Sequence, residues 1–325
     1  MRVLITDKIR PPLDLEQRAL GNVATAELFD EPPNQLDGCV ANVDGLIICH
    51  EVTVTEKTIA AMDQCRVIVR AGVGVDNVDL DAARARQIAV CNIPDYGVDE
   101  VADHAIGLTI ALNRGFFEIE RRLRDTLKPW NRDAIHPTLR LSESTMGIIG
   151  CGRIGSATAQ RARALKMKVL IYDPYLRPGM EKVVDATRVD LPTLLTTSDF
   201  VSVHTPLTDE TRKIINDETI ATMPSHAMLI NTSRGGVVDV DAVADALQAN
   251  RIGGAAIDVL PQEPPSSASK LIQLWQQQSA NINLIITPHT AYYSESAIRE
   301  IRTKGAEEVA RVLRGEAPLN CVNPW

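Results

Sequence analysis

The chain lacks an excess of positive charge, and it lacks any long apolar run. Lys and Arg total 34 against 42 Asp and Glu, which gives a net charge of −8 and a pI near 5.4. This balance argues against nucleic acid or an anionic membrane as the main partner, although it leaves room for a local basic pocket. No stretch of ~18 apolar residues occurs, so we expect no membrane span.

Paired cysteines are also missing. The six cysteines are scattered, without a C-x-x-C motif or paired histidines. We interpret them as reduced thiols of a cytoplasmic protein, with zinc ligation or disulfides as less favoured alternatives. The opening MRVLITD lacks the charged head and long apolar run of a signal peptide, which also favours the cytoplasm.

The most informative stretch is TMGIIGCGRIGSATAQRARALKMKVLIYD, residues 145–173. Its order is an apolar run, glycines spaced G-x-G-x-x-G at Gly150, Gly152 and Gly155, a helical pattern, and a second apolar run ending at Asp173. This order is typical of a dinucleotide-binding βαβ unit, in which the glycines permit a tight turn, close approach of a pyrophosphate and close helix packing. Asp173 would bind a ribose diol and repel a 2′-phosphate, so NAD is favoured over NADP.

Ahead of this motif, apolar runs alternate with helical patterns. This alternation predicts a complete α/β domain with a parallel sheet in residues 1–97. Its glycine-rich loop would offer backbone N–H groups to a carboxylate, and Arg70 would bind a second anionic group. The alternative is that Arg70 is an ordinary surface salt-bridge residue. The candidate substrate-binding residues are Arg70, Ala71, Gly72, Val73 and Gly74.

Apolar residues at intervals of three and four predict one long helix over residues 98–124. Such a helix can connect domains, form a dimer contact or belong to the core, and we favour connector and dimer contact together. Residues 125–141 lack periodicity and are expected to form a crossing loop.

Four ionisable residues lie at or just after predicted strands of a second β/α array: Arg234, Asp258, Glu263 and His289. Histidine suits the proton transfer that accompanies hydride movement at a carbon bearing oxygen. A neighbouring Glu263 would fix its tautomer and favour imidazolium. Arg234 would bind a substrate carboxylate and polarise the adjacent carbonyl. The alternatives are a structural histidine and a solvated loop acid.

On these motifs the chain resembles the D-isomer-specific 2-hydroxyacid dehydrogenases. Within that family it is most similar to the branch of phosphoglycerate dehydrogenases and C-terminal-binding proteins. The matching segments follow one another along nearly the whole chain: RAGVGVDNVDL (70–80), GIIGCGRIG (147–155), YDP (172–174), VHTPLTDETRKIIN (203–216), INTSRGGVVD (230–239), AIDVLPQEPP (256–265) and TPHTAYYSE (287–295).

The resemblance implies an α/β fold with two doubly wound parallel-sheet domains. A Rossmann NAD-binding domain, residues 99–292, would be inserted in a flavodoxin-like substrate domain, residues 1–98 plus 293–325. It also implies a homodimer and a catalytic set of Arg234, Glu263 and His289. The expected cofactor-binding residues are Gly150, Gly152, Arg153, Ile154, Gly155, Asp173, His204, Thr205, Thr232, Ser233 and Asp258.

The sequence therefore predicts an NAD-dependent dehydrogenase that interconverts a D-2-hydroxy acid and its 2-oxo acid, with His289 as acid and base. The candidate substrates include 3-phosphoglycerate, and no metal site is expected. Two alternatives are an NAD(H)-sensing interaction protein like the C-terminal-binding proteins, and a reductase of glyoxylate or hydroxypyruvate that shares the catalytic residues.

Overall fold

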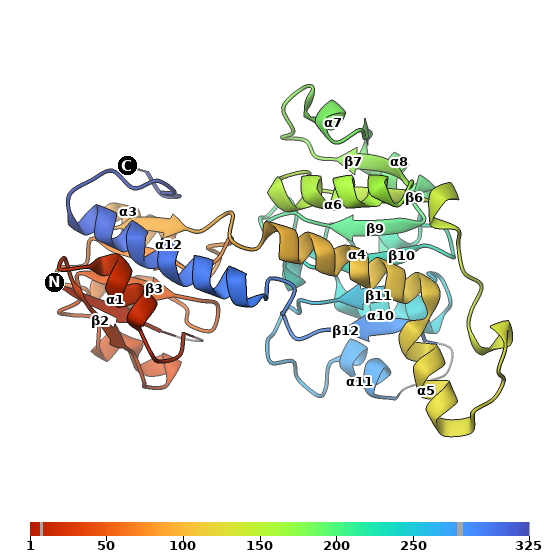
Figure 1. Ribbon diagram of the computed structural model, residues 1–325, viewed down its shortest axis with the longest axis horizontal. Helices are drawn as coiled ribbons and strands as arrows, with labels where there is room; N and C mark the ends of the chain where they lie inside the picture. The colour runs from red at the N-terminus through yellow and green to blue at the C-terminus, as the bar shows by residue number, and fades with distance from the viewer. Residues whose placement is uncertain (7–8, 278–281, 325) are drawn as a thin grey trace. The chain divides into compact units, whose positions relative to one another are not determined.

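The chain forms two compact units, each built on a parallel sheet (Figure 1). The computed structural model describes residues 1–6, 9–277 and 282–324. The first unit comprises Met1–Gly97 and Ser294–Trp325, and the second comprises Val98–Tyr293. The chain thus leaves the first unit once and returns to it for its last helix.

The first unit holds a parallel sheet in the order β2-β1-β3-β4-β5. Helices α1 and α12 pack together, and α12 lies against β3 and β4, while η1, α2 and α3 pack over the other face. The strands are β1 (Arg2–Ile5), β2 (Thr25–Leu28), β3 (Gly45–Ile48), β4 (Val67–Arg70) and β5 (Ala89–Asn92). The helices are α1 (Asp14–Leu20), η1 (Pro33–Gly38), α2 (Glu56–Ala60), α3 (Leu80–Ala85) and α12 (Glu295–Leu313).

The second unit holds a parallel sheet in the order β12-β11-β10-β9-β6-β7-β8. The strands are β6 (Thr145–Ile149), β7 (Lys168–Tyr172), β8 (Thr187–Arg188), β9 (Phe200–Val203), β10 (Met228–Asn231), β11 (Gly254–Ile257) and β12 (Leu284–Ile286). The chain builds outward from β6 to β8, then restarts at β9 on the other side of β6. Open sheets of this kind bind ligands at the carboxyl ends of the strands, where the order reverses. The predicted fold class of doubly wound parallel sheets is confirmed.

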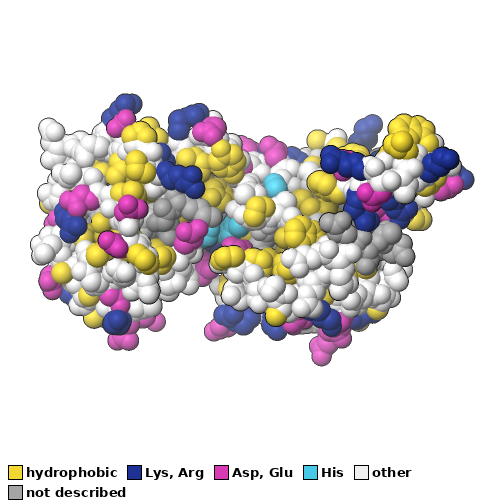
Figure 2. Space-filling model, turned by 90° about the horizontal axis from the view of Figure 1, so that it is seen from below, with side chains coloured by type: hydrophobic (Ala, Val, Ile, Leu, Met, Phe, Trp, Pro, Cys, Tyr) yellow, Lys and Arg dark blue, Asp and Glu magenta, His cyan; other side chains and the backbone are white. Residues whose placement is uncertain are grey.

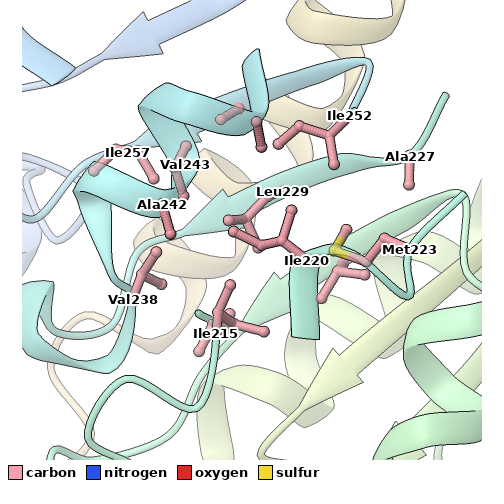
Figure 3. Close-up of a cluster of buried hydrophobic side chains, with 14 of the residues drawn as sticks. Ile215, Ile220, Met223, Ala227, Leu229, Val238, Ala242, Val243, Ile252 and Ile257 are labelled. Carbon is pink, nitrogen blue, oxygen red and sulfur yellow. The ribbon is translucent and has the colours of Figure 1, made fainter. Parts of the chain in front are cut away.

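Helices cover both faces of the second sheet because its strands are apolar on both sides. Along β10, Leu229 packs into one core, whereas Met228 and Ile230 pack into the other, as the alternation of strand side chains requires. Figure 3 shows the core that contains Leu229, with Ile220 and Val243 packed beside it. Burial of these side chains holds the strand ends at one common edge.

The helices on one face are α4 (Val98–Arg114) and α6 (Arg153–Ala164), which contact each other (Figure 1). The other helices of the unit are α5 (Phe116–Thr126), η2 (Arg132–Ala134), η3 (Leu141–Glu143), α7 (Met180–Val183), α8 (Leu191–Thr197), α9 (Asp217–Ile220), η4 (Gly235–Val237), α10 (Val240–Gln248) and α11 (Lys270–Gln276).

The single helix predicted over residues 98–124 is wrong in one respect. The helix is broken into α4 and α5 at Gly115, which adopts a left-handed φ of 60°. Glycine adopts this conformation without the steric cost that other residues incur. Apolar residues keep the same helical spacing on both sides of Gly115. The sequence pattern therefore predicted one helix where the structure has two.

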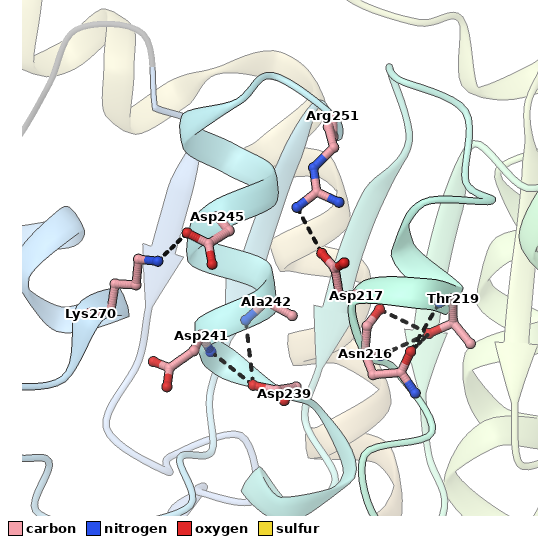
Figure 4. A network of polar contacts seen from close by, with 9 residues as sticks. All are labelled: Asn216, Asp217, Thr219, Asp239, Asp241, Ala242, Asp245, Arg251 and Lys270. Atoms are coloured by element: carbon pink, nitrogen blue, oxygen red, sulfur yellow. Dashed lines mark hydrogen bonds and ion pairs between the residues drawn. The ribbon is translucent and has the colours of Figure 1, made fainter.

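Side-chain caps fix the helices that follow β9 and β10 (Figure 4). Asn216 and Thr219 form a capping box at the start of α9, and Asp239 accepts hydrogen bonds from two backbone N–H groups at the start of α10. Arg251 forms an ion pair with Asp217 at 2.9 Å. Such caps each contribute about 1 kcal/mol to helix stability. Among the described residues, none of the helices combines the length and the apolar character needed to cross a membrane.

Candidate active site

The glycine turn after β6 is shaped by close contacts at two of its three glycines. A Cβ atom on Gly155 would lie 2.0 Å from the backbone oxygen of Gly150, and one on Gly150 would lie 2.8 Å from the backbone oxygen of His204. A Cβ atom on Gly152 would meet nothing within 4 Å. The turn is therefore tightly packed on the protein side and open at Gly152.

Helix α6 begins directly after this open position. Gly152 is its N-cap residue, and no side chain caps the helix. The first N–H groups of a helix lack partners within the helix and favour an anion. Arg153 and Ile154 form the start of this first turn. The turn thus combines space and backbone donors of the kind that a pyrophosphate requires.

Asp173, at the end of β7, holds the glycine turn. One of its carboxylate oxygens accepts a hydrogen bond from the N–H of Cys151 at 2.8 Å, and the other accepts one from the N–H of Tyr175 at 2.9 Å. Each carboxylate oxygen has a second lone pair. Asp173 therefore positions the turn and retains acceptor capacity for a ribose, which stays a prediction.

Buried polar atoms without protein partners gather after β9 and β10. Among the described residues these include Nδ1 of His204 and the hydroxyl oxygens of Thr205 and Thr232. Buried polar atoms in native proteins are almost always hydrogen-bonded, so these atoms fit a polar ligand. Burial lowers the pKa of His204 to about 4, so its ring is neutral, and Nε2 lies 2.8 Å from the hydroxyl of Ser202.

Asp258 is a buried carboxylate, 1 % exposed, at the end of β11. It accepts hydrogen bonds from the hydroxyl of Thr287 at 2.5 Å and from the N–H groups of Thr290 and Ala291 at 3.0 and 3.1 Å. These contacts join the ends of β11 and β12, where His289 follows. Asp258 thereby fixes the segment that carries the candidate catalytic histidine.

His104 is a further member of this cluster that the sequence reasoning missed. It lies on α4, and its Nε2 is 3.2 Å from the Thr287 hydroxyl oxygen and 3.7 Å from a carboxylate oxygen of Asp258. Helix α4 packs along one face of the sheet, and this packing brings its N-terminal part, with His104, to the carboxyl end of β12. The sequence offered one signal for His104, namely a polar side chain placed among the apolar residues of a predicted helix.

His289 and Glu263 form the closest ionisable pair of the site. Nδ1 of His289 lies 2.6 Å from one carboxylate oxygen of Glu263, and the other oxygen accepts a hydrogen bond from the N–H of Leu260 at 2.8 Å. His289 has a left-handed φ of 53°, and its N–H donates to the backbone oxygen of Asp258 at 2.8 Å. Because Nδ1 is held by the carboxylate, Nε2 is the ring atom that we propose for proton transfer.

Arg234 lies in the loop after β10. Its Nη1 donates to the backbone oxygen of Ser233 at 2.9 Å, and Asn231 donates to the backbone oxygen of Arg234 at 3.0 Å. The next residue, Gly235, packs so closely that a Cβ atom there would lie 2.0 Å from the carbonyl carbon of Leu260. This contact places the arginine loop against the segment whose N–H holds Glu263.

The five candidate substrate-binding residues belong to the first unit, and their role stays a prediction. Arg70 is the last residue of β4 and is 7 % exposed. Its Nη1 donates to the backbone oxygen of Ala71 at 3.3 Å and lies where a Cβ atom of Gly72 would be. Arg70 is thus buried, and the alternative that it is an ordinary salt-bridge residue stays a prediction. Val73 and Gly74 follow in the same loop, where Val73 is 38 % exposed.

Comparison with known proteins defines the class. Residues 106–291 match the model of the D-isomer specific 2-hydroxyacid dehydrogenase family, NAD binding domain. The chain belongs to this family, and its second unit carries the NAD-binding domain. The resemblance deduced from the motifs, and NAD as cofactor, are both confirmed.

Relatives are found in bacteria and plants. The chain is 36 % identical over 328 residues to D-3-phosphoglycerate dehydrogenase of Synechocystis, covering 99 % of this chain and 56 % of that protein. It is 35 % identical to the chloroplastic D-3-phosphoglycerate dehydrogenase 2 of Arabidopsis thaliana, covering 99 % of this chain and 50 % of that one. The chain thus spans about half the length of these curated relatives.

Solved structures share the whole architecture. A D-lactate dehydrogenase of Aquifex aeolicus, solved with NAD and lactic acid, is 29 % identical with a TM-score of 0.88, covering 99 % of both chains. A protein of Thermus thermophilus is 32 % identical with a TM-score of 0.87, covering 99 % of this chain and 100 % of that one.

Proposed function

We propose that this protein is an NAD-dependent oxidoreductase that interconverts a D-2-hydroxy acid and its 2-oxo acid. The observation that carries the proposal is the pair of His289 and Glu263, 2.6 Å apart, in the same unit as the open glycine turn. NAD supplies the hydride acceptor in one direction and, when reduced, the hydride donor in the other. The chain must then bind the acid, orient it and move one proton.

His289 is the proposed acid and base. Its Nε2 gives a proton to the alkoxide that forms as the carbonyl is reduced, and it takes the proton back in oxidation. Glu263 holds Nδ1 and fixes the orientation and tautomer of the ring, as a paired carboxylate does for a catalytic histidine. Arg234 binds the substrate carboxylate and polarises the neighbouring carbonyl without titrating. Glu263 is thus a positioning residue.

The proposed cofactor contacts lie along the strand ends of the second unit. The backbone of the glycine turn binds the pyrophosphate, and Asp173 binds the ribose. The orphan polar atoms of His204, Thr205 and Thr232 support polar contacts nearby. The full proposed set is Gly150, Gly152, Arg153, Ile154, Gly155, Asp173, His204, Thr205, Thr232, Ser233 and Asp258.

The first unit is the proposed substrate domain, with boundaries near residues 98 and 293. Its glycine loop after β4 presents a buried guanidinium at Arg70, which suits a second anionic group on the substrate. The two curated relatives act on D-3-phosphoglycerate by name, and this acid carries such a group. We therefore propose 3-phosphoglycerate as the first substrate to test.

We further propose that the protein is a cytoplasmic homodimer joined through the second unit. Large apolar side chains are exposed on α5 and just after it: Phe116 (53 %), Phe117 (62 %), Leu127 (66 %) and Trp130 (78 %). Hydrophobic and basic side chains gather at that end of the second unit in Figure 2. Exposed apolar groups of this kind mark association surfaces. The six cysteines are free thiols, which agrees with a reducing compartment.

The proposal is tested by NADH oxidation with a panel of 2-oxo acids: phosphohydroxypyruvate, hydroxypyruvate, glyoxylate, phenylpyruvate and 2-oxoglutarate. We expect turnover of phosphohydroxypyruvate, lost in His289→Gln. Preference for hydroxypyruvate or glyoxylate would assign the reductase alternative. Tight NADH binding without turnover of any acid would contradict the enzyme and support the NAD(H)-sensing alternative.

A further inference from the structure

The C-terminal segment extends the sheet of the first unit beyond its edge strand β5. The N–H of Val322 donates to the backbone oxygen of Val90 at 2.8 Å, and the N–H of Asn92 donates to the backbone oxygen of Asn320 at 3.2 Å. These two bonds flank an antiparallel bridge between Cys91 and Cys321. Figure 1 shows the end of the chain, in dark blue, returning over this unit.

Two buried polar side chains hold this segment in register. Asn323, fully buried, accepts from the N–H of Val90 at 2.7 Å and donates to the backbone oxygen of Ile88 at 3.0 Å. Glu308 on α12, 3 % exposed, accepts from the N–H groups of Leu319 and Asn320 at 2.7 and 3.1 Å. A shift in register would leave these buried groups unpaired, so the position of Cys321 opposite Cys91 is strongly fixed.

The bridge is a non-hydrogen-bonded antiparallel pair, because its hydrogen bonds lie one residue to either side. Residues in such pairs have Cα atoms about 4.5 Å apart and side chains on the same face. Disulfides join Cα atoms separated by about 4.4–6.8 Å. Both cysteines are free thiols, and the charge of Cys321 helps to raise the pKa of the Cys91 thiol, after the larger effects of burial and Glu308. The bridge itself places the two side chains opposite each other on one face of the paired strands.

We propose that Cys91 and Cys321 form a reversible disulfide that fastens the C-terminal segment to β5. The oxidant is a hydroperoxide such as hydrogen peroxide. The Cys321 sulfur, in the less buried residue of the pair, attacks a peroxide oxygen, the O–O bond breaks, and a sulfenic acid and water result. The Cys91 sulfur then attacks the sulfenic sulfur, and the S–O bond breaks. The Cys91 thiol proton goes to the departing hydroxide, which leaves as water.

The step balances as two thiols oxidised by two electrons and one hydrogen peroxide reduced to two waters. A dithiol reductant reverses it by thiol–disulfide exchange. The bond closes a loop from residue 91 to residue 321 that contains the whole second unit. Closing so long a loop restricts the unfolded chain and raises the unfolding temperature. It also keeps the edge of the sheet covered by the C-terminal segment.

The test uses the full chain, treated with hydrogen peroxide or with dithiothreitol and digested for mass spectrometry. We expect one linked peptide pair that joins Cys91 to Cys321, lighter by two hydrogens than the separate peptides. We also expect Tm to rise on the order of 5 °C in the oxidised form and to return on reduction.

The matched controls are three serine variants. Cys91→Ser and Cys321→Ser should each abolish the linked peptides and the rise in Tm. Cys65→Ser removes another buried thiol of the same unit, whose sulfur donates to the backbone oxygen of Val67 at 3.4 Å, and should keep both. Should peroxide convert Cys321 to a sulfinic acid with Cys91 still free, or should links join other cysteines, the proposal is overturned. The outcome does not depend on NADH turnover.

Discussion

Two glycine-rich loops follow parallel strands in this protein, and they are built differently. The loop after β6 leads at once into α6, and the space in front of Gly152 is open. The loop after β4 folds onto itself, because the guanidinium of Arg70 occupies the space in front of Gly72, whose φ is 153°. The loop after β6 thus has open space beside its backbone N–H groups. The loop after β4 is filled by the buried guanidinium of Arg70.

The difference teaches that glycine after a parallel strand does not by itself define a phosphate site. We propose that Gly152 serves a ligand, since a side chain there would collide with nothing in the protein. Gly72 serves a neighbouring side chain, since a Cβ atom there would lie 1.3 Å from Nη1 of Arg70. The second unit carries the NAD-binding domain, and we propose that the first binds an anionic group of the substrate.

The largest expected effect concerns the proposed acid and base of the second unit, His289, and its positioning residue Glu263. His289→Gln should lower kcat about 1,000-fold, because it removes the proton donor, and Glu263→Gln about 100-fold. Because Glu263 acts through His289, the double variant should be no slower than His289→Gln alone. The check is kcat in a double-mutant cycle, with NADH affinity measured in parallel. Additive losses would show that Glu263 acts independently.

The next effect separates the two loops. Gly152→Ala should weaken NADH binding about 100-fold and leave Tm unchanged, because the new methyl group meets the cofactor and not the protein. Fluorescence titration with NADH and a thermal melt measure the two quantities. A large fall in Tm with unchanged NADH binding would mean that Gly152 is required for stability and not for cofactor binding.

A smaller effect is the acid sensitivity of the second unit. The pKa of His204 is about 4 in the folded protein against an ordinary 6.5, because burial disfavours the charged ring. The unfolded chain therefore binds a proton first, and the stability from this residue is present above pH 6.5 and lost as the pH falls toward 4.

From pH 7 to pH 5 this loss amounts to about 2 kcal/mol of unfolding free energy. Urea unfolding at the two pH values measures it. His204→Gln keeps a polar side chain that does not titrate, so the variant should lose about 2 kcal/mol less than the natural protein over this range. If the variant and the natural protein lost the same unfolding free energy between pH 7 and pH 5, another group would cause the acid sensitivity.

The smallest effect concerns the loop of the first unit. Gly72→Ala displaces the guanidinium of Arg70, so KM for a phosphorylated 2-oxo acid should rise about 10-fold while NADH affinity stays constant. Arg70→Lys keeps the charge but loses the planar pair of donors, and should show a similar rise. Equal KM values for phosphorylated and unphosphorylated acids in all variants would show that Arg70 does not bind the substrate phosphate.

Much of the fold followed from local patterns. The strand, glycine turn, helix and acid of residues 145–173 specify β6, α6 and β7 by hydrophobic period and turn chemistry, and the family resemblance is confirmed by the comparisons. The two-residue strand β8 was missed because it is too short to show a period. The break at Gly115 was missed because the apolar stripe runs through it.

The rest depends on tertiary packing that no local pattern carries. His104 reaches Thr287 only because α4 packs along the sheet face with its N-terminal part at the carboxyl end of β12. Cys91 faces Cys321 across a wide separation in sequence, and buried Asn323 and Glu308 set that register. The roles of the catalytic and cofactor residues, and the boundaries near 98 and 293, stay predictions that the experiments above address.

The most direct test of the central claim is hydride transfer in a single turnover. The natural protein and His289→Gln are each saturated with NADH, mixed with phosphohydroxypyruvate, and followed by nicotinamide absorbance in a stopped-flow instrument. We predict a rapid loss of NADH in the natural protein and a rate about 1,000-fold lower in His289→Gln at equal NADH occupancy. Equal rates in the two proteins would contradict His289 as the proton donor and, with it, the proposed mechanism.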